Sequence, residues 1–198
     1  MIPRQSVECP LLRECSMRRR RMVLLSAFGA IFAASSVLTP NIANAGTGPP
    51  TYIVNAQSGL TTFLVSPPNC HNMTCLNGAP FKLGSGSDFS RFYTTKNAAG
   101  LVQFHWTLDK CVDVLNGGTQ NGTSVVLNDC NGSLGQLWFP SKISSGKFLL
   151  INGNGGGCLD ADNPGFPNPP HAGARLQLWS CANSASAFIG NQTWQVDL

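Results

Sequence analysis

Few side chains in this sequence could perform acid–base or nucleophilic chemistry. Three histidines, His71, His105 and His171, are spread along the chain, and no glutamate follows Glu14, so aspartates supply every later carboxylate. Paired glutamates, a Gly-x-Ser-x-Gly nucleophile motif or closely spaced metal ligands would indicate catalysis, and none is present. We therefore expect no catalytic residues, no cofactor and no metal, and we interpret the histidines as ordinary loop residues.

Cysteine is the other residue type with chemistry to offer. Six cysteines follow the first 45 residues: Cys70, Cys75, Cys111, Cys130, Cys158 and Cys181. An even number in an exported chain indicates disulfides, with fifteen pairings open in principle. A zinc site at Cys70, His71 and Cys75 is the alternative for the first two, although structural zinc takes four closely grouped ligands.

The first 45 residues have the layout of a secretory signal peptide. Arginines 18–21 precede an apolar run over 22–38, and the small residues 43–45 follow it. We expect cleavage after residue 45, with Met17 as an alternative translation start and the twin-arginine system as an alternative export route. An uncleaved membrane anchor is disfavoured, because the run is shorter than the ~20 strongly apolar residues of a spanning helix.

Residues 46–198 have the length of one domain and a balanced charge. Seven Lys and Arg residues stand against seven aspartates, so the net charge of +4 comes from the leader. A neutral surface provides no electrostatic footprint for nucleic acid or for anionic membranes. We expect a secreted, single-domain protein that binds no nucleic acid and does not insert into a membrane after cleavage.

A repeat organises the second half of the chain. Residues 110–138 contain Cys-x-Asp, an alternating apolar stretch that ends in Cys, and Gln-x-Trp; residues 157–194 contain the same elements in the same order. The two Cys-x-Asp segments start at Cys111 and Cys158, 47 residues apart. Because the cysteines recur at matching places, we predict the disulfides Cys111–Cys130 and Cys158–Cys181, which leaves Cys70–Cys75 as the third pair.

A third, degenerate copy precedes these two. The segment 78–83 lines up with 122–127, and Arg91-Phe92-Tyr93 stands where Gln-x-Trp would be, but the Cys-x-Asp element is missing. We place the units at about residues 51–100, 101–145 and 146–198.

Within each unit the local pattern is that of β-strands. Residues 125–127 and 176–179 are short strand candidates, and the strand candidate 147–151 ends at Asn152-Gly153, a hairpin signal. No segment after residue 46 has a sustained helical period. Three copies of such a unit predict an all-β barrel with threefold symmetry.

The two complete units resemble the repeats of ricin-type lectins, in which three such units form a β-trefoil. The resemblance is specific over residues 110–198 and loose over 51–109. It implies that Trp138 and Trp194 lie in the shared core. It also implies a carbohydrate-binding protein, with galactose-type sugars, glycans or glycoconjugates as ligands.

Carried over from this family, the third unit has all the groups of a sugar site. Asp160 would accept hydrogen bonds from two neighbouring hydroxyls, and Trp179 would cover the C–H face of the sugar. Asn191 would bind the same hydroxyls and Gln192 would hold Asp160 in place. Gln177 stands where a further contact is expected. A purely structural role for Asp160 and Trp179 is the alternative, but Trp194 already supplies the core aromatic of this unit.

The other two units depart from this pattern. In the middle unit Asp113 and Gln136 persist, but Asn128 takes the place of the aromatic platform, Val126 that of Gln177, and Gly135 that of Asn191. We therefore expect the middle site to be silent. The first unit lacks the aspartate and should be silent too. Its aromatic residues could instead form a surface patch, with Phe81, Phe89, Phe92 and Tyr93 as members.

A proline-rich stretch, residues 162–171, separates Asp160 from Trp179. We expect it to form a stiff lip in which Phe166 or His171 shapes one wall of the pocket. The same insertion could also displace Asp160. Two further functions remain open: the cell-attachment subunit of a bacterial toxin, which would have a toxin or enzyme chain as partner, and a trefoil that inhibits or binds proteins without sugar.

Overall fold

The computed structural model describes residues 49–198 except 88, 108, 166–167 and 184–186. The predicted signal peptide, its cleavage site and the alternative start at Met17 lie outside the described residues. Among the helices of the described part, none is long and apolar enough to cross a membrane.

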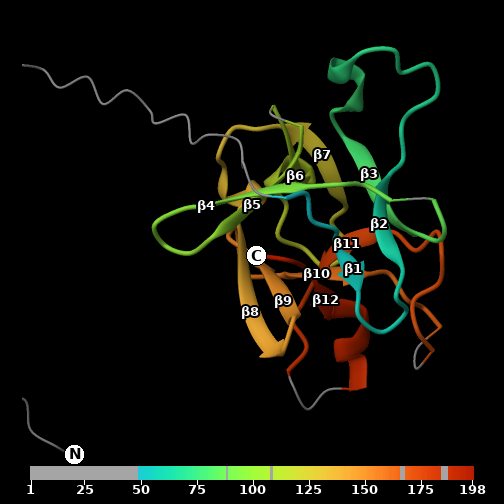
Figure 1. Cartoon of the computed structure of the whole chain (residues 1–198), viewed down its shortest axis with the longest axis vertical. Helices are drawn as coiled ribbons and strands as arrows, with labels where there is room; N and C mark the ends of the chain where they lie inside the picture. Colours follow the sequence, from blue (N-terminus) through green and yellow to red (C-terminus); the bar gives the residue numbers. More distant parts are fainter. Residues whose placement is uncertain (1–48, 88, 108, 166–167, 184–186) are drawn as a thin grey trace, which may run out of the picture. The chain divides into compact units, whose positions relative to one another are not determined.

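The described residues form an antiparallel, all-β fold, as predicted (Figure 1). The strands are β1 Val54–Asn55, β2 Thr61–Leu64, β3 Ala79–Gly84, β4 Tyr93–Lys96, β5 Val102–Thr107, β6 Lys110–Val114, β7 Val125–Asp129, β8 Trp138–Ser144, β9 Lys147–Asn152, β10 Cys158–Ala161, β11 Leu176–Trp179 and β12 Trp194–Gln195. Short 3₁₀ helices connect some of them: η1 Met73–Leu76, η2 Leu115–Gly117, η3 Leu134–Gln136 and η4 Ala187–Gln192.

The strands repeat in a threefold pattern. Each unit contributes one hairpin: β2–β3 in the first, β6–β7 in the second and β10–β11 in the third. The strand pairs β4–β5 and β8–β9 join each unit to the next, and β12–β1 joins the third unit to the first. In Figure 1 the pair β8 and β9 runs side by side in orange. The three predicted strands are confirmed as parts of β7, β9 and β11. The hairpin signal at Asn152-Gly153 is also confirmed, because a turn there leads from β9 into the antiparallel β10, with Ile151 opposite Cys158. A second, tighter hairpin turn precedes β9 at Gly146, whose φ of 67° favours glycine.

Three large aromatic side chains, one from each unit, occupy equivalent places in the core. Trp138 and Trp194 are buried there, as the resemblance implied. In the first unit the equivalent residue is Phe92. Tyr93 occupies the same position in the strand pairing as Phe139, the residue after Trp138, so the residue before Tyr93 corresponds to Trp138. The expected alignment of Tyr93 with the tryptophans was therefore wrong by one residue, and Tyr93 lies on the surface.

All three predicted disulfides are present: Cys70–Cys75, Cys111–Cys130 and Cys158–Cys181. Because Cys70 and Cys75 are bonded to each other, the alternative zinc site with His71 was wrong. The latter two bridges have the same Cα–Cα distance of 5.0 Å and tie together the two strands of equivalent hairpins. Each closes a loop of about twenty residues, which is worth about 3 kcal/mol in chain entropy.

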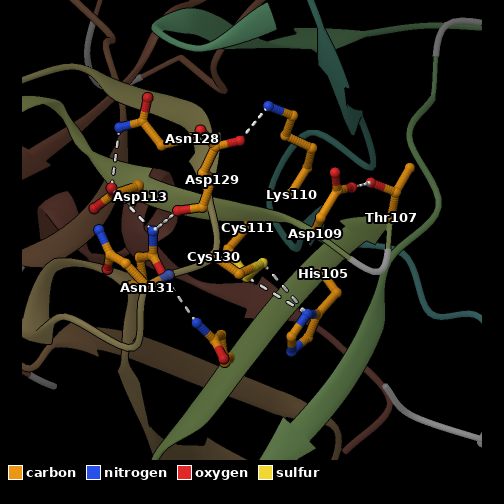
Figure 2. The surroundings of a disulfide bond; sticks show 12 residues. His105, Thr107, Asp109, Lys110, Cys111, Asp113, Asn128, Asp129, Cys130 and Asn131 are labelled. Atoms are coloured by element: carbon orange, nitrogen blue, oxygen red, sulfur yellow. Dashed lines mark hydrogen bonds and ion pairs between the residues drawn. A yellow bond between two sulfur atoms is a disulfide. The ribbon is translucent and has the colours of Figure 1, made fainter. Parts of the chain in front are cut away.

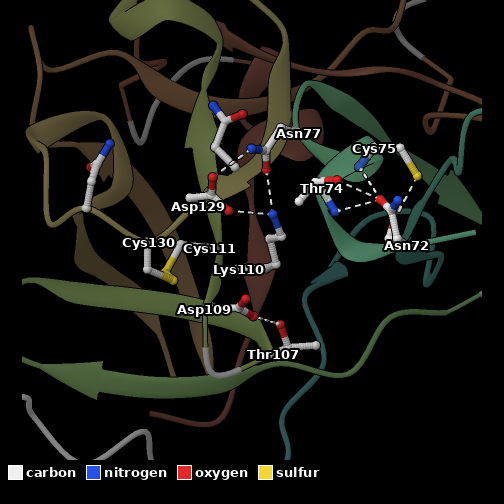
Figure 3. Close-up of polar contacts among 12 residues, drawn as sticks. Asn72, Thr74, Cys75, Asn77, Thr107, Asp109, Lys110, Cys111, Asp129 and Cys130 are labelled. Carbon is white, nitrogen blue, oxygen red and sulfur yellow. Dashed lines mark hydrogen bonds and ion pairs between the residues drawn. A yellow bond between two sulfur atoms is a disulfide. The ribbon is translucent and has the colours of Figure 1, made fainter. Parts of the chain in front are cut away.

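A buried lysine links the first unit to the middle one (Figure 3). The ammonium of Lys110 donates to Asn77 Oδ1 at 2.8 Å and forms an ion pair with Asp129. Asn77 Nδ2 in turn donates to Asp129 Oδ2 at 2.8 Å. The hydrogen bond from Lys110, followed by the one from Asn77, lowers the pKa of Asp129, so the carboxylate stays ionised beside the lysine.

Candidate functional site

The hairpin β10–β11 places a carboxylate, an amide and an indole on one face. In its register Asp160 lies opposite Gln177, and Cys158 lies opposite Trp179. Because side chains alternate along a strand, residues two apart share a face. Asp160 lies two residues after Cys158, and Trp179 lies two residues after Gln177, so the pairing of the two strands brings Asp160, Gln177 and Trp179 to one face by local geometry alone.

Three amide groups converge on the carboxylate of Asp160. Gln177 Nε2 donates to Oδ1 at 3.0 Å, whereas Asn191 Nδ2 and Gln192 Nε2 donate to Oδ2 at 2.7 and 3.0 Å. Gln192 is itself held in place, since its Oε1 accepts from the Ala182 amide at 2.7 Å. The carboxylate is thus oriented by its neighbours, as predicted for Gln192.

Burial makes Asp160 an unusual acid. Its side chain is only 2% exposed, and this burial raises the pKa of Asp160 to about 6, against the opposing hydrogen bonds from Gln177 and Gln192. The nearby charge of Asp162 acts in the same direction as burial. Arg175 acts on Asp160 only indirectly, because its guanidinium donates to Gln177 Oε1 at 3.0 Å and so polarises the amide that faces Asp160. The carboxylate is ionised at neutral pH and loses its charge in mild acid.

A cavity of about 420 Å³ opens onto these groups. Its walls are Asp160, Asp162, Asn163, Pro164, Gln177, Trp179, Ser180, Ala182, Asn191 and Gln192. Trp179 is 44% exposed although it is a large aromatic, so its ring is available to a bound molecule. Asn191 Oδ1 is buried without a hydrogen-bond partner among the described residues, which is an unfavourable state for an amide oxygen.

The structure brings all five sequence-predicted site residues to this one cavity. The start of the proline-rich stretch supplies a wall through Asp162, Asn163 and Pro164, and Asp160 is not displaced. His171 is exposed, with Nδ1 2.8 Å from the carbonyl of Ala172, and it does not line the cavity, contrary to expectation. Phe166 lies outside the described residues.

The wall residues of that stretch were not among the predicted site residues, although the alternation of side chains along a strand indicates one of them. Asp162 follows Asp160 by two residues, so an extended chain turns both carboxylates to the same side. Asn163 and Pro164 follow at once, whereas the chosen candidates lie farther along the insertion.

In the middle unit the equivalent carboxylate, Asp113, is hydrogen-bonded by neighbouring protein groups (Figure 2). Asn128 Nδ2 donates to Asp113 Oδ2 at 3.0 Å, and Gln136 Nε2 donates to the same oxygen at 3.2 Å. The other oxygen of Asp113 accepts from the backbone amide of Val114 at 2.7 Å. A side chain at Gly135 would start 2.7 Å from that oxygen, so no residue like Asn191 fits there as the site stands.

The first unit has no carboxylate at the corresponding position. Phe63 lies opposite Lys82, as Asp160 lies opposite Gln177 in the third unit. The expected aromatic surface patch was wrong for two of its four members, because Phe81 and Phe92 are core residues; Phe89 and Tyr93 are exposed. The described structure thus contains one hairpin with the full set of site groups.

The fold of the described chain is that of known β-trefoils. A designed threefold-symmetric protein, ThreeFoil, is similar at a TM-score of 0.59 and 21% identity over 75% of this chain and 99% of its own. An exo-beta-1,3-galactanase from Clostridium thermocellum is similar at 0.60 and 18%, over 77% of this chain and 31% of its own. A Polyporus squamosus lectin, solved with a Neu5Aca2-6Galb1-4GlcNAc epitope, is similar at 0.55 and 15%, over 76% and 49%. This chain spans less than half the length of the last two, and the likeness concerns the trefoil.

Sequence comparison decides the family. No curated protein matches the chain. The family model of the ricin-type beta-trefoil lectin domain matches residues 98–198, which is just over half of the chain and includes both complete repeats. The chain therefore belongs to the ricin-type β-trefoil lectin family, whose role is carbohydrate binding.

Proposed function

We propose that this protein is a secreted lectin with one working sugar site, the cavity at β10–β11, and that its ligands are galactose-type sugars on glycans or glycoconjugates. One observation carries the proposal: three amides and an exposed indole surround a single buried carboxylate in an open cavity. No other hairpin of the described residues combines these groups.

Each group matches one part of a sugar. The indole of Trp179 covers a flat patch of C–H groups, which contributes about 1 kcal/mol beyond simple area burial. The ionised carboxylate of Asp160 accepts hydrogen bonds from two adjacent hydroxyls, which are stronger than bonds between neutral groups. Asn191 offers a further donor and acceptor at the same edge. Gln177 and Gln192 act through Asp160, because they hold its carboxylate in place.

The arrangement suits binding rather than hydrolysis. Glycoside hydrolysis requires two carboxylates that divide the roles of acid and of base or nucleophile. Here Asp160 is held by three amides, and the second acidic wall residue, Asp162, is paired with Arg175 at 3.3 Å. The family and its trefoil relatives support a binding module without catalytic machinery.

Export is supported by two features. Residues 1–45 have the layout of a signal peptide, and the described part contains three disulfides, which persist in oxidising compartments. With one shallow site per chain we expect weak binding to a single sugar and stronger binding to surfaces that present many copies.

A matched pair of variants tests the site. Asp160→Ala and Asp113→Ala remove the same residue from equivalent hairpins, so both lose one buried carboxylate. On a glycan array, and in galactose elution from an affinity column, we expect Asp160→Ala to abolish binding and Asp113→Ala to retain it. Trp179→Ala should weaken binding about tenfold or more, because it removes stacking and buried area together.

Three outcomes would contradict the proposal. The wild-type protein could ignore every saccharide, which would favour a trefoil that binds proteins. It could lose binding equally in both aspartate variants, which would place the site elsewhere. It could co-purify with a catalytic chain, which would make it a toxin or enzyme subunit rather than a free lectin.

A further inference from the structure

A histidine lies against the disulfide of the middle unit (Figure 2). His105 Nδ1 is 3.4 Å from Cys111 Sγ and 3.6 Å from Cys130 Sγ. In the third unit Ile151 takes the place of His105, because it pairs with Cys158 as His105 pairs with Cys111. The fold therefore accepts an aliphatic residue at this position, and the histidine is not required for the trefoil.

The surroundings of His105 favour a neutral ring with one nitrogen turned to the sulfurs. Its side chain is buried, and burial lowers the pKa of His105. Nε2 is 2.9 Å from the hydroxyl of Thr95. When Nε2 donates to this hydroxyl, Nδ1 keeps its lone pair and directs it at Cys111 and Cys130. A partner on the second ring nitrogen is the usual arrangement around histidines that bind metals.

The distances already fit a metal ion. Zinc bonds of about 2.3 Å to sulfur and about 2.05 Å to nitrogen, at tetrahedral angles, separate the two ligand atoms by about 3.6 Å. The observed separations of 3.4 and 3.6 Å agree with this value. Only the two sulfur atoms would have to move. They are bonded to each other in the disulfide and would lie about 3.8 Å apart as zinc ligands. Among the described residues, His105, Cys111 and Cys130 form a cluster of potential metal ligands whose ligand atoms all lie within 4.8 Å of one another.

We propose that reduction of Cys111–Cys130 turns this cluster into a binding site for a thiophilic divalent cation such as Zn²⁺, with Cys111, Cys130 and His105 as ligands and a water molecule in the fourth position. A dithiol is the reductant: it gives two electrons and two protons to the protein disulfide and becomes a disulfide itself. Cation binding then releases the two thiol protons to solvent, because thiolates are the ligands. Cys130 is partly exposed, which gives the reductant access.

The site is independent of the sugar cavity. Its ligands lie on β5, β6 and the end of the β6–β7 hairpin, whereas the cavity belongs to β10–β11 and η4. It also differs from the zinc site first considered at Cys70, because His71 does not join Cys70 and Cys75 in a ligand cluster.

The test uses the full exported chain, reduced with a dithiol and titrated with Co²⁺ and then Zn²⁺ under anaerobic conditions. We expect the wild type to bind one Co²⁺ with a thiolate-to-cobalt charge-transfer band that Zn²⁺ abolishes. His105→Ala should lose this band. Thr95→Val, which removes only the partner of the ring, should weaken Zn²⁺ binding by roughly 10- to 100-fold. Ile151→His should add a second site at Cys158–Cys181.

Near-UV circular dichroism of the buried tryptophans monitors folding in the same samples. If reduction unfolds the chain, Zn²⁺ should restore this signal in the wild type and not in His105→Ala. Equal metal affinity of wild type and His105→Ala would overturn the proposal, because it would mean that loose thiols bind the cation. So would an absence of Co²⁺ absorption in the reduced wild type, whether folded or unfolded.

Discussion

Acid should weaken sugar binding before it affects the fold. The perturbed group is Asp160, whose burial raises its pKa to about 6. The carboxylate is the acceptor for sugar hydroxyls in the proposed site, and its protonated form offers one acceptor fewer. Binding therefore depends on the fraction of chains in which this one group is ionised.

The size of the effect follows from that fraction. With a pKa of about 6, about 90% of the carboxylates are ionised at pH 7 and about 9% at pH 5, so the apparent Kd rises about tenfold between them. Between pH 8 and pH 7 the apparent Kd should hardly change, because ionisation is nearly complete at both. An ordinary aspartate, with a pKa of 3.8, would show almost no effect above pH 5.

Isothermal titration with a galactoside from pH 8 to pH 4.5 measures this profile. Asp113→Asn is the matched control, since it changes the equivalent carboxylate of the middle unit and should leave the profile unchanged. A constant Kd down to pH 5 would refute the reasoning, as would a midpoint that moves in Asp113→Asn.

Stability should change in the opposite direction, which separates titration of Asp160 from acid unfolding. The pKa of Asp160 is higher in the folded chain than in the unfolded one, so the stability that its protonation contributes is fully present below 3.8 and is lost as the pH rises through 6. The shift corresponds to about 3 kcal/mol. In urea unfolding, Asp160→Asn should gain about 2 kcal/mol relative to wild type as the pH rises from 4 to 7.5. A pH-independent difference would contradict this.

Three further predictions concern the scaffold. Trp194→Phe should cost about 1–3 kcal/mol more unfolding free energy than Trp138→Phe, because the Trp194 indole donates to a buried carbonyl at 2.9 Å whereas the Trp138 indole nitrogen has no partner among the described residues; equal losses would contradict this. Asp129→Asn should lower the melting temperature at neutral pH. The difference in melting temperature from wild type should shrink as the pH falls below 3.8, because pairing with Lys110 lowers the pKa of Asp129. A difference that persists in acid would argue against the ion pair. Asn128→Trp alone should not create a second sugar site, so titration should still give one site per chain; two sites would show that the aromatic platform was the only missing part.

The five residues predicted for the third-unit site line one cavity largely because local spacing determines where most of them lie. Cys158 and Asp160 are two residues apart, as are Gln177 and Trp179. In paired strands such spacings place the side chains on a common face, whatever the rest of the chain does. Two disulfides were predictable from the repeat, since their cysteines recur at matching places in the two complete units, and this left Cys70–Cys75 as the third pair. The all-β class and threefold pattern followed from counting these repeats.

What the sequence could not predict depends on contacts between distant segments. The register of the first unit is set by pairing of β4 with β5, and without a Cys-x-Asp element nothing local indicated that Phe92, not Tyr93, enters the core. The course of the proline-rich stretch was equally open, so its first residues, rather than His171, form the cavity wall. The capping of Asp113 by Asn128 depends on side-chain conformation, which a pattern of residue types does not contain.

Comparison of the two equivalent aspartates explains why only one of them is available to a ligand. Asp113 uses one oxygen on the backbone amide of Val114 and the other on Asn128 and Gln136, so the protein itself satisfies it. Asp160 has only amide side chains as partners, pays for its burial with a raised pKa, and faces an open cavity. Both carboxylates accept three hydrogen bonds from the chain, but Asp160 also lines an open cavity, where hydroxyls of a ligand can add further donors to it. The cost of keeping Asp160 ionised in the free protein and the affinity for sugar should therefore share one origin, the burial of this carboxylate at the cavity.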